Sequence, residues 1–271
     1  MIPLFAVAAL LFGAIAGAQP VLKNAQVAER VVTGSLEATV RSIVEQTTAP
    51  AWIAWETSAL PKHRGENWCW SDGAVIRSNR LEPADTLFVF LRVETRLIER
   101  VRMFDDGCPI DAGNRPVIWL RDVKPDDSAA LLDSFASGQS PLSSRDNGRV
   151  AKAAMAALAQ HAAPNALERL LRLARQSPDP KLRGDALFWL AHRAGQRAEA
   201  AITQAIANDP ETEVKKKAVF ALSQLPPDQG VPLLIQVART HANPAVRKQA
   251  FFWLGQSKDA RALAFFEEVL R

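Results

Sequence analysis

The feature that most constrains this chain is a 32-residue repeat in its C-terminal half. Most of its four segments open on a residue that suits a helix N-cap, and two of them continue with proline at the first helical position. A second amphipathic stretch follows each segment within the same period, so each repeat is predicted to be a pair of helices. The four segments are NGRVAKAAMAAL from Asn147, DPKLRGDALFWL from Asp179, ETEVKKKAVFAL from Glu211 and NPAVRKQAFFWL from Asn243.

When the four segments are aligned at their first residues, four columns are mostly apolar and are predicted to form the core of the stack. They fall at positions i, i+4, i+6 and i+8 of the first helix, with alanine where a neighbouring backbone must approach. One helix pair cannot bury its apolar face alone, so successive pairs must share a continuous core. The columns are Val150, Leu182, Val214 and Val246; Ala154, Ala186, Ala218 and Ala250; Ala156, Phe188, Phe220 and Phe252; and Leu158, Leu190, Leu222 and Leu254.

The pattern D/N-P-x-V/L-R/K-x-x-A-x-x-x-L, followed by a second amphipathic helix, resembles a HEAT repeat of the short bacterial type. This type is also called HEAT-like or phycobilin-lyase-type. The resemblance covers about 125 residues and implies an α-solenoid, most often an interaction scaffold, with no catalytic residues to carry over. The whole chain is also similar in layout to exported bacterial HEAT-repeat proteins, whose repeats resemble AVFALSQLP and AFFWLGQS in this sequence.

Residues 1–18 are predicted to be a signal peptide. The apolar run Ile2–Ala16 is shorter than the roughly 20 residues that span a bilayer, and Ala16-Gly17-Ala18 provides a small-x-small cleavage site. No Lys or Arg precedes the run, so an uncleaved anchor or an upstream start stays an alternative. Cleavage would leave a periplasmic or secreted protein without stable membrane insertion.

Residues 19–138 lack the repeat and predict a small α+β module. A linker over 139–146 is expected to join it to the repeat domain, 147–271. The predicted fold class is therefore an α+β N-terminal module followed by an all-α HEAT-like α-solenoid of four helix pairs. The module's strands are predicted at 51–55, 86–93, 97–104 and 116–120, its helices at 35–44 and 126–135, and a hairpin turn at Glu94-Thr95-Arg96.

Cys69 and Cys108 are predicted to form a disulfide, because export would place both in an oxidising compartment. Two free buried thiols are the alternative. Trp68 and Trp70 flank Cys69 in a loop that either packs on the sheet or forms a recognition surface. The nearby His and acidic residues match no zinc or calcium spacing, so no metal site is predicted.

Arg183, Lys215 and Arg247 form a basic column on three successive first helices. One interpretation is a set of salt bridges between repeats. The other is a basic strip that faces a ligand. Three further lysines would extend that strip: Lys216, Lys217 and Lys248.

Trp189 and Trp253 share a column that holds alanine in the other two repeats. They either pack at the seam between helices or form an aromatic platform for a ligand. The three histidines of the repeats do not share a column and are predicted to lie at the surface. These are His161, His192 and His241.

The charge distribution and the missing motifs limit the function. Residues 150–271 hold 17 Lys and Arg against 11 Asp and Glu, whereas residues 1–149 hold 16 against 18. This excess is too small for a nucleic-acid interface but favours a partner with an acidic surface. No hydrolase, P-loop or dinucleotide-binding motif is present.

The sequence therefore predicts an exported, non-enzymatic scaffold or adaptor that binds a protein or peptide through the solenoid and needs no cofactor. A groove lined by the second helices would favour it. One alternative is a lyase-like or chromophore-binding protein of the same repeat class. Another is an N-terminal module that senses a ligand and uses the solenoid as a docking platform.

Overall fold

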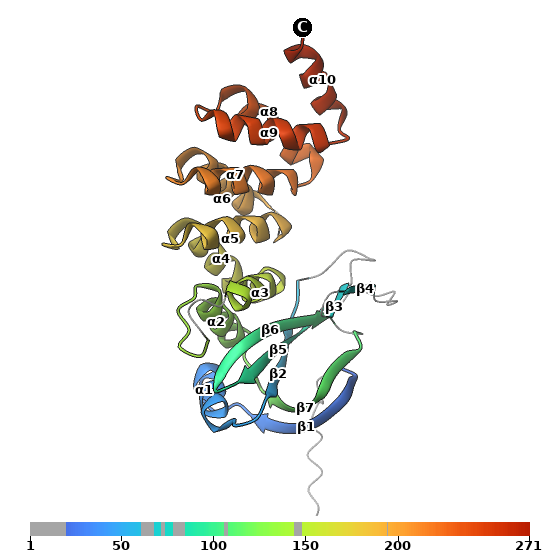
Figure 1. Ribbon diagram of the computed structural model, residues 1–271, viewed down its shortest axis with the longest axis vertical. Coiled ribbons are helices and arrows are strands. Elements are labelled where there is room, and N and C mark those ends of the chain that lie inside the picture. The colour runs from blue at the N-terminus through green and yellow to red at the C-terminus, as the bar shows by residue number, and fades with distance from the viewer. Residues whose placement is uncertain are drawn as a thin grey trace, which may run out of the picture.

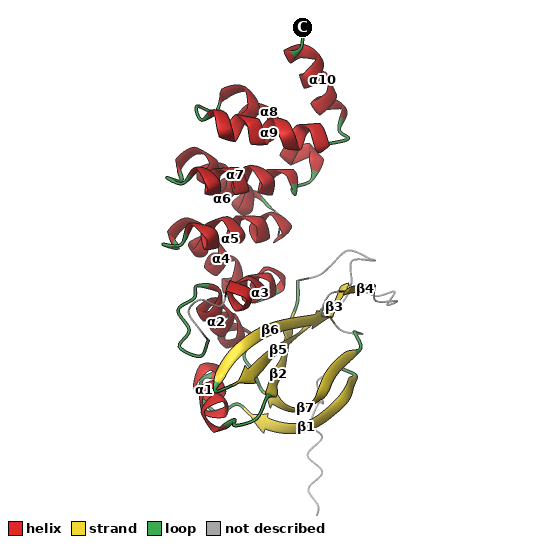
Figure 2. Ribbon diagram, in the orientation of Figure 1, coloured by secondary structure: helices red, strands yellow, loops and turns green. Residues whose placement is uncertain are grey.

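The computed structural model describes residues 20–60, 68–71, 74–77, 85–105, 108–143, 148–193 and 195–271, with the backbone alone at 68–71 and 74–77. A mixed sheet comes first, and paired helices then stack away from it in a row (Figures 1 and 2). This arrangement confirms the predicted fold class. The predicted signal peptide and the side chains of Trp68, Cys69 and Trp70 lie outside the described residues.

Within the described residues, five strands form one sheet in the order β1-β7-β2-β5-β6. Strand β7 lies between β1 and β2 and runs parallel to both, while β2-β5 and β5-β6 are antiparallel. The predicted hairpin turn is confirmed between β5 and β6, where Thr95 and Arg96 have φ values of 51° and 60°. The strands are β1 (Leu22–Val31), β2 (Ala51–Ser58), β5 (Thr86–Glu94), β6 (Leu97–Asp105) and β7 (Ile110–Arg121).

The module also contains a short two-stranded ribbon and an edge strand that the sequence did not predict. Strands β3 (Trp68–Ser71) and β4 (Ala74–Arg77) pair with each other in a separate antiparallel ribbon. The first edge strand, β1, was not predicted, because its sequence LKNAQVAERV is mostly exposed and shows no regular apolar alternation.

The sheet is buried on both faces, which explains the nearly continuous apolar run of β5. Alternate residues of a strand point to opposite faces. Ile53 and Leu91 belong to the core that includes helices α1 (Leu36–Gln46) and α2 (Pro125–Ala136). The opposite face carries an aromatic cluster. Phe90 contacts the rings of Trp52, Phe104 and Trp119, and Trp119 in turn contacts Phe88.

Each repeat is a helix pair, and the first helices begin one residue after the predicted N-caps. Asp179 and Asn243 accept backbone N–H groups of Lys181 and Ala245 at 2.8 and 2.9 Å, whereas Glu211 forms no side-chain cap. The first helices are α3 (Gly148–Gln160), α5 (Pro180–Arg193), α7 (Thr212–Ser223) and α9 (Pro244–Gln256); the second helices are α4 (Pro164–Gln176), α6 (Gln196–Asn208), α8 (Pro227–Thr240) and α10 (Ala260–Val269).

The alanine and leucine columns are confirmed as core, since all four alanines are 0% exposed. The predicted core position of the Phe188, Phe220 and Phe252 column is wrong: Phe252 is 54% exposed and the other two rings are half-buried. At about 100° per residue, i+6 lies about 240° around the helix from i, whereas i+4 and i+8 lie within about 80°. The phenylalanines therefore project beside the core, along the outer side of the first helices.

The stretch between module and repeats is packed where it is described. The predicted linker, 139–146, is described up to Ser143, and Leu142 within it is buried. The Ile98 N–H donates to the Leu142 carbonyl at 2.6 Å, which fixes this stretch to β6. Helix α2 also packs against α3 and α4, and one cluster of buried residues runs from the sheet into the repeats. The first repeat is thus covered by the module.

Candidate functional site

His161 lies where the first repeat meets the sheet, and its predicted surface position is wrong. The side chain is 0% exposed, and Nδ1 accepts the Ala163 N–H at 3.0 Å. The proton is therefore on Nε2, which lies 3.0 Å from Ser128 Oγ and 3.1 Å from Thr57 Oγ1. Trp55 Nε1 donates to the same Ser128 hydroxyl at 2.9 Å. This buried network joins β2, α2 and the first repeat.

Electrostatics keep this histidine neutral. Burial, with a smaller contribution from the nearby Arg193 charge, lowers the pKa of His161 to about 4 against the opposing effect of Asp126. Arg193 Nη1 donates to the carbonyls of Leu158, Ala159 and His161 at 2.9, 3.1 and 3.0 Å. It thus provides a donor for carbonyl groups at the C-terminus of α3 that lack a partner within the helix. Ser128 and His161 resemble a nucleophile and its base, but both are fully buried, so the pair is structural.

The other two repeat histidines differ in exposure. His192 is exposed, as predicted. His241 is half-buried, because its Nε2 hydrogen-bonds to the Ile206 carbonyl at 3.0 Å and its Nδ1 accepts the Asn243 N–H. Its predicted surface position is therefore only partly right.

All three members of the basic column bond within the repeat stack. Arg183 forms a two-point ion pair with Asp209, with Nε–Oδ2 and Nη2–Oδ1 distances of 2.8 and 3.0 Å. Lys215 Nζ donates to a carbonyl at the end of α6, and Arg247 Nη1 donates to the His241 carbonyl after α8. Burial acts to raise the pKa of Asp209, but the Arg183 hydrogen bond and charge hold it below its usual value. The Lys215 and Arg247 bonds connect successive repeats, whereas the Arg183–Asp209 pair lies within the second repeat. A binding role for the column stays a prediction.

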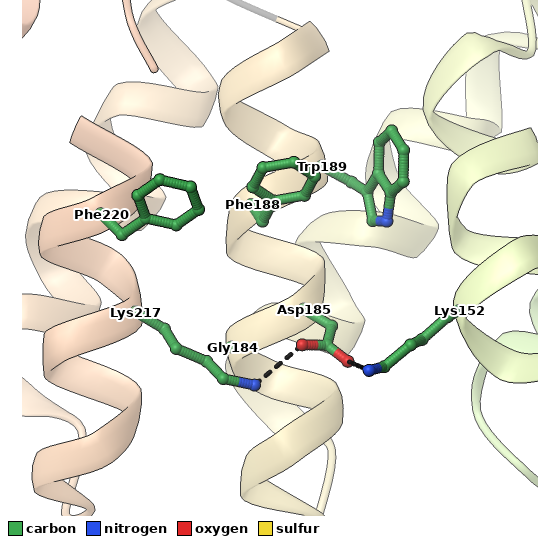
Figure 3. Close-up of a pocket in the computed structure, with 7 residues that line it drawn as sticks. All are labelled: Lys152, Gly184, Asp185, Phe188, Trp189, Lys217 and Phe220. Carbon is green, nitrogen blue, oxygen red and sulfur yellow. Dashed lines mark hydrogen bonds and ion pairs between the residues drawn. The ribbon is translucent and has the colours of Figure 1, made fainter. Parts of the chain in front are cut away.

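The lysines predicted to extend this column have different surroundings. Lys216 pairs with Glu213 on its own helix at 3.0 Å, and Lys248 is exposed. Lys217 instead reaches from α7 to α5, where its Nζ lies 2.8 Å from Asp185 Oδ1. Lys152 approaches the same carboxylate from α3, with Nζ 3.9 Å from Oδ2. We call Lys152, Asp185 and Lys217 the charged row (Figure 3).

Trp189 and Trp253 belong to a set of touching aromatic rings along α5, α7 and α9, named here the aromatic strip. Phe188 and Phe220 stack with centroids 5.7 Å apart and an interplanar angle of 11°. Trp189 meets Phe188 at 5.1 Å, and Trp253 meets Phe220 at 4.7 Å. Phe252 extends the strip, with its centroid 4.9 Å from that of Trp253. The strip crosses three repeats on the first-helix side.

An open groove of about 300 Å³ lies between the charged row and the aromatic strip. Helices α3, α5 and α7 line it, so the first helices form this groove and not the second helices. Gly184 lies on α5 beneath it, and a Cβ there would overlap Cδ of Lys217. The missing side chain therefore lets the Lys217 stem cross α5 to reach Asp185. The lining residues are Lys152, Gly184, Asp185, Phe188, Trp189, Lys217 and Phe220.

Sequence reasoning proposed Trp189 and Lys217 but missed the other groove residues. The sequence predicts a core position for Phe188 and Phe220 and no role for Asp185 or Lys152. One signal was present: Asp185 and Lys217 are 32 residues apart and opposite in charge, so they fall in one column of adjacent repeats.

The remaining site predictions concern the N-terminal module. Trp68 and Trp70 lie outside the described side chains, so their role stays a prediction. Cys108 is buried two residues before β7, but the Cys69 side chain is not described, so the disulfide also stays a prediction. Among the described residues, no group of three His, Cys, Asp or Glu side chains is placed to hold a metal ion. In the same part of the chain, no helix has the length and apolar character needed to cross a membrane.

Residues 199–271 match the family described as HEAT repeats. The match spans most of α6 and continues to the end of the given sequence, so it supports HEAT repeats in the C-terminal part of the chain. A comparison with curated proteins finds none that matches. HEAT repeats are commonly protein-interaction scaffolds, which use the long surface created by stacking.

Proposed function

We propose that this protein is an exported, non-enzymatic scaffold that binds a protein partner along the first-helix side of its HEAT repeats. The observation that carries the proposal is the aromatic strip. Trp189 and Trp253 pack partly against the core, but the alanine and leucine columns already close it, so packing does not require the exposed ring of Phe252. Aromatic side chains are the residues that most often anchor protein interfaces.

The shape of the strip also supports a protein partner. Its rings extend across α5, α7 and α9, which is longer than a single small-molecule pocket. Contiguous exposed apolar patches are uncommon on monomeric proteins and mark interaction surfaces. The excess of Lys and Arg in residues 150–271 supports a partner with an acidic surface.

Export is the second part of the proposal, and it rests on residues 1–18. The mature chain would begin at Gln19, and an oxidising compartment would favour the Cys69–Cys108 disulfide. N-terminal sequencing of protein from the extracytoplasmic fraction should find Gln19 first. Thiol titration of the denatured, unreduced protein should detect no free cysteine. An intact Met1 in a cytoplasmic fraction would refute export.

Site-specific photo-crosslinking tests the binding surface. A photo-reactive phenylalanine analogue at Phe252 should give a discrete protein adduct in intact cells, because this ring is exposed at the end of the strip. The same analogue at Gln204, an exposed residue of the second helix α6, is the control. No adduct at 252, or equal adducts at both positions, would contradict the proposed surface.

A further inference from the structure

We infer that the groove between the charged row and the aromatic strip holds an acidic peptide segment of the partner, with a large apolar side chain next to a carboxylate. This inference rests on the proposed function and names the chemistry recognised at one place on that surface. Its basis is the close approach of an apolar wall and a lysine-rich rim in a single open groove (Figure 3).

The apolar half of the groove suits one large side chain. Phe188, Trp189 and Phe220 form its wall, and the stacked Phe188–Phe220 pair leaves no room between the two rings. A guest side chain must therefore lie against the rings, over α5. The volume of about 300 Å³ is at the small end for ligand pockets, which fits one residue and its neighbours better than a large cofactor.

The charged half of the groove carries two lysines and one carboxylate. Lys217 is the closer partner of Asp185, at 2.8 Å, whereas Lys152 is 3.9 Å away and its side chain is 69% exposed. An exposed ion pair contributes at most about 1 kcal/mol, so Lys152 can turn to another carboxylate at little cost. A peptide carboxylate beside the aromatic wall would form an ion pair with Lys152. Lysine and carboxylate groups would then alternate along the groove.

Gly184 makes room for the charged side of the groove. Its repeat column reads Lys152, Gly184, Lys216 and Lys248, so glycine replaces lysine in the second repeat alone. A long side chain at this position would fill the space that the Lys217 stem crosses. The glycine thus opens the floor of the groove and places the lysines of two neighbouring helices at its two sides.

Selection from a random peptide library on the full mature chain tests the inference. Enriched peptides should carry Phe, Leu, Ile or Trp directly beside Asp or Glu. Lys152→Glu should weaken binding of an enriched peptide about tenfold, because it replaces attraction by repulsion at the rim. Lys258→Glu is the matched control, since it makes the same change of charge at an exposed residue outside the groove, and should leave binding unchanged.

The outcomes separate this inference from the proposed function. Enrichment of apolar residues without acidic neighbours, or equal effects of Lys152→Glu and Lys258→Glu, would overturn the inference. A partner adduct at position 252 that survives Lys152→Glu would then leave the scaffold function standing. Absence of any adduct at position 252 would instead count against the proposed function itself.

Discussion

The junction between sheet and first repeat and the groove on α3, α5 and α7 both combine polar side chains with aromatic rings, but they use them differently. At the junction, His161 has a fixed partner for each ring nitrogen and no contact with solvent. In the groove, two lysines share Asp185 and the rings beside them are half-exposed. The junction is therefore saturated with internal contacts, whereas the groove retains the capacity to bind.

The largest expected effect is at the junction. His161→Ala should lower the free energy of unfolding by about 4 kcal/mol, because it creates a cavity and removes the hydrogen bonds that His161 makes to the Ala163 N–H and to the Thr57 and Ser128 hydroxyls. Urea unfolding monitored by circular dichroism measures the change. His192→Ala, at an exposed position on the groove side, should change stability by less than about 0.5 kcal/mol. Similar losses in both variants would remove the distinction between the regions.

Acid should act on the same junction. The pKa of His161 is about 4 in the folded chain against an ordinary value of 6.5, so the unfolded chain takes up a proton first as pH falls. Stability from this group is complete above pH 6.5 and is lost progressively towards pH 4, by about 3 kcal/mol in total. Urea midpoints measured across this range test it. His161→Gln should flatten the pH dependence; an unchanged slope in that variant would assign the titration to another group.

In the groove, a substitution is expected to affect binding more than stability. Gly184→Ala should change the free energy of unfolding by less than about 1 kcal/mol, since alanine favours the helix by about as much as the displaced Lys217–Asp185 pair contributes. Binding of a selected acidic peptide should nevertheless fall several-fold, as measured by fluorescence anisotropy. Gly255→Ala in α9 is the control, because its Cβ would meet nothing closer than Phe266 Cζ at 3.9 Å. Equal binding by both variants would show that the groove floor is not used.

The repeat architecture could be predicted from sequence because its spacing directly reports the contacts. Alanine and leucine columns recur at positions that share one helix face, and the structure buries both. The predicted core position of the phenylalanine column was wrong, because apolar character alone does not show which face of the helix a side chain lies on. Strand β1 was missed for the opposite reason, since an edge strand with mostly exposed residues has little apolar pattern to recognise.

The groove was harder to predict than the fold. Its residues come from three helices, and Lys152, Asp185 and Lys217 meet only after the repeats stack. Gly184 gives no local signal in the sequence, because its role is to leave space for a side chain from the next repeat. His161 was assigned to the surface for a similar reason: its partners Thr57 and Ser128 are distant in the sequence.

The position of β7 between β1 and β2 has a consequence for the order in which the chain can fold. Its pairing with β1 joins Leu22 to Ile110, residues almost 90 positions apart, and its pairing with β2 joins Trp52 to Val117. Contacts this distant in sequence form slowly, because a long loop must close first. The helix pairs depend on contacts between neighbouring repeats and can form independently. We therefore expect the repeats to assemble first and to offer α3 as a surface on which the sheet closes.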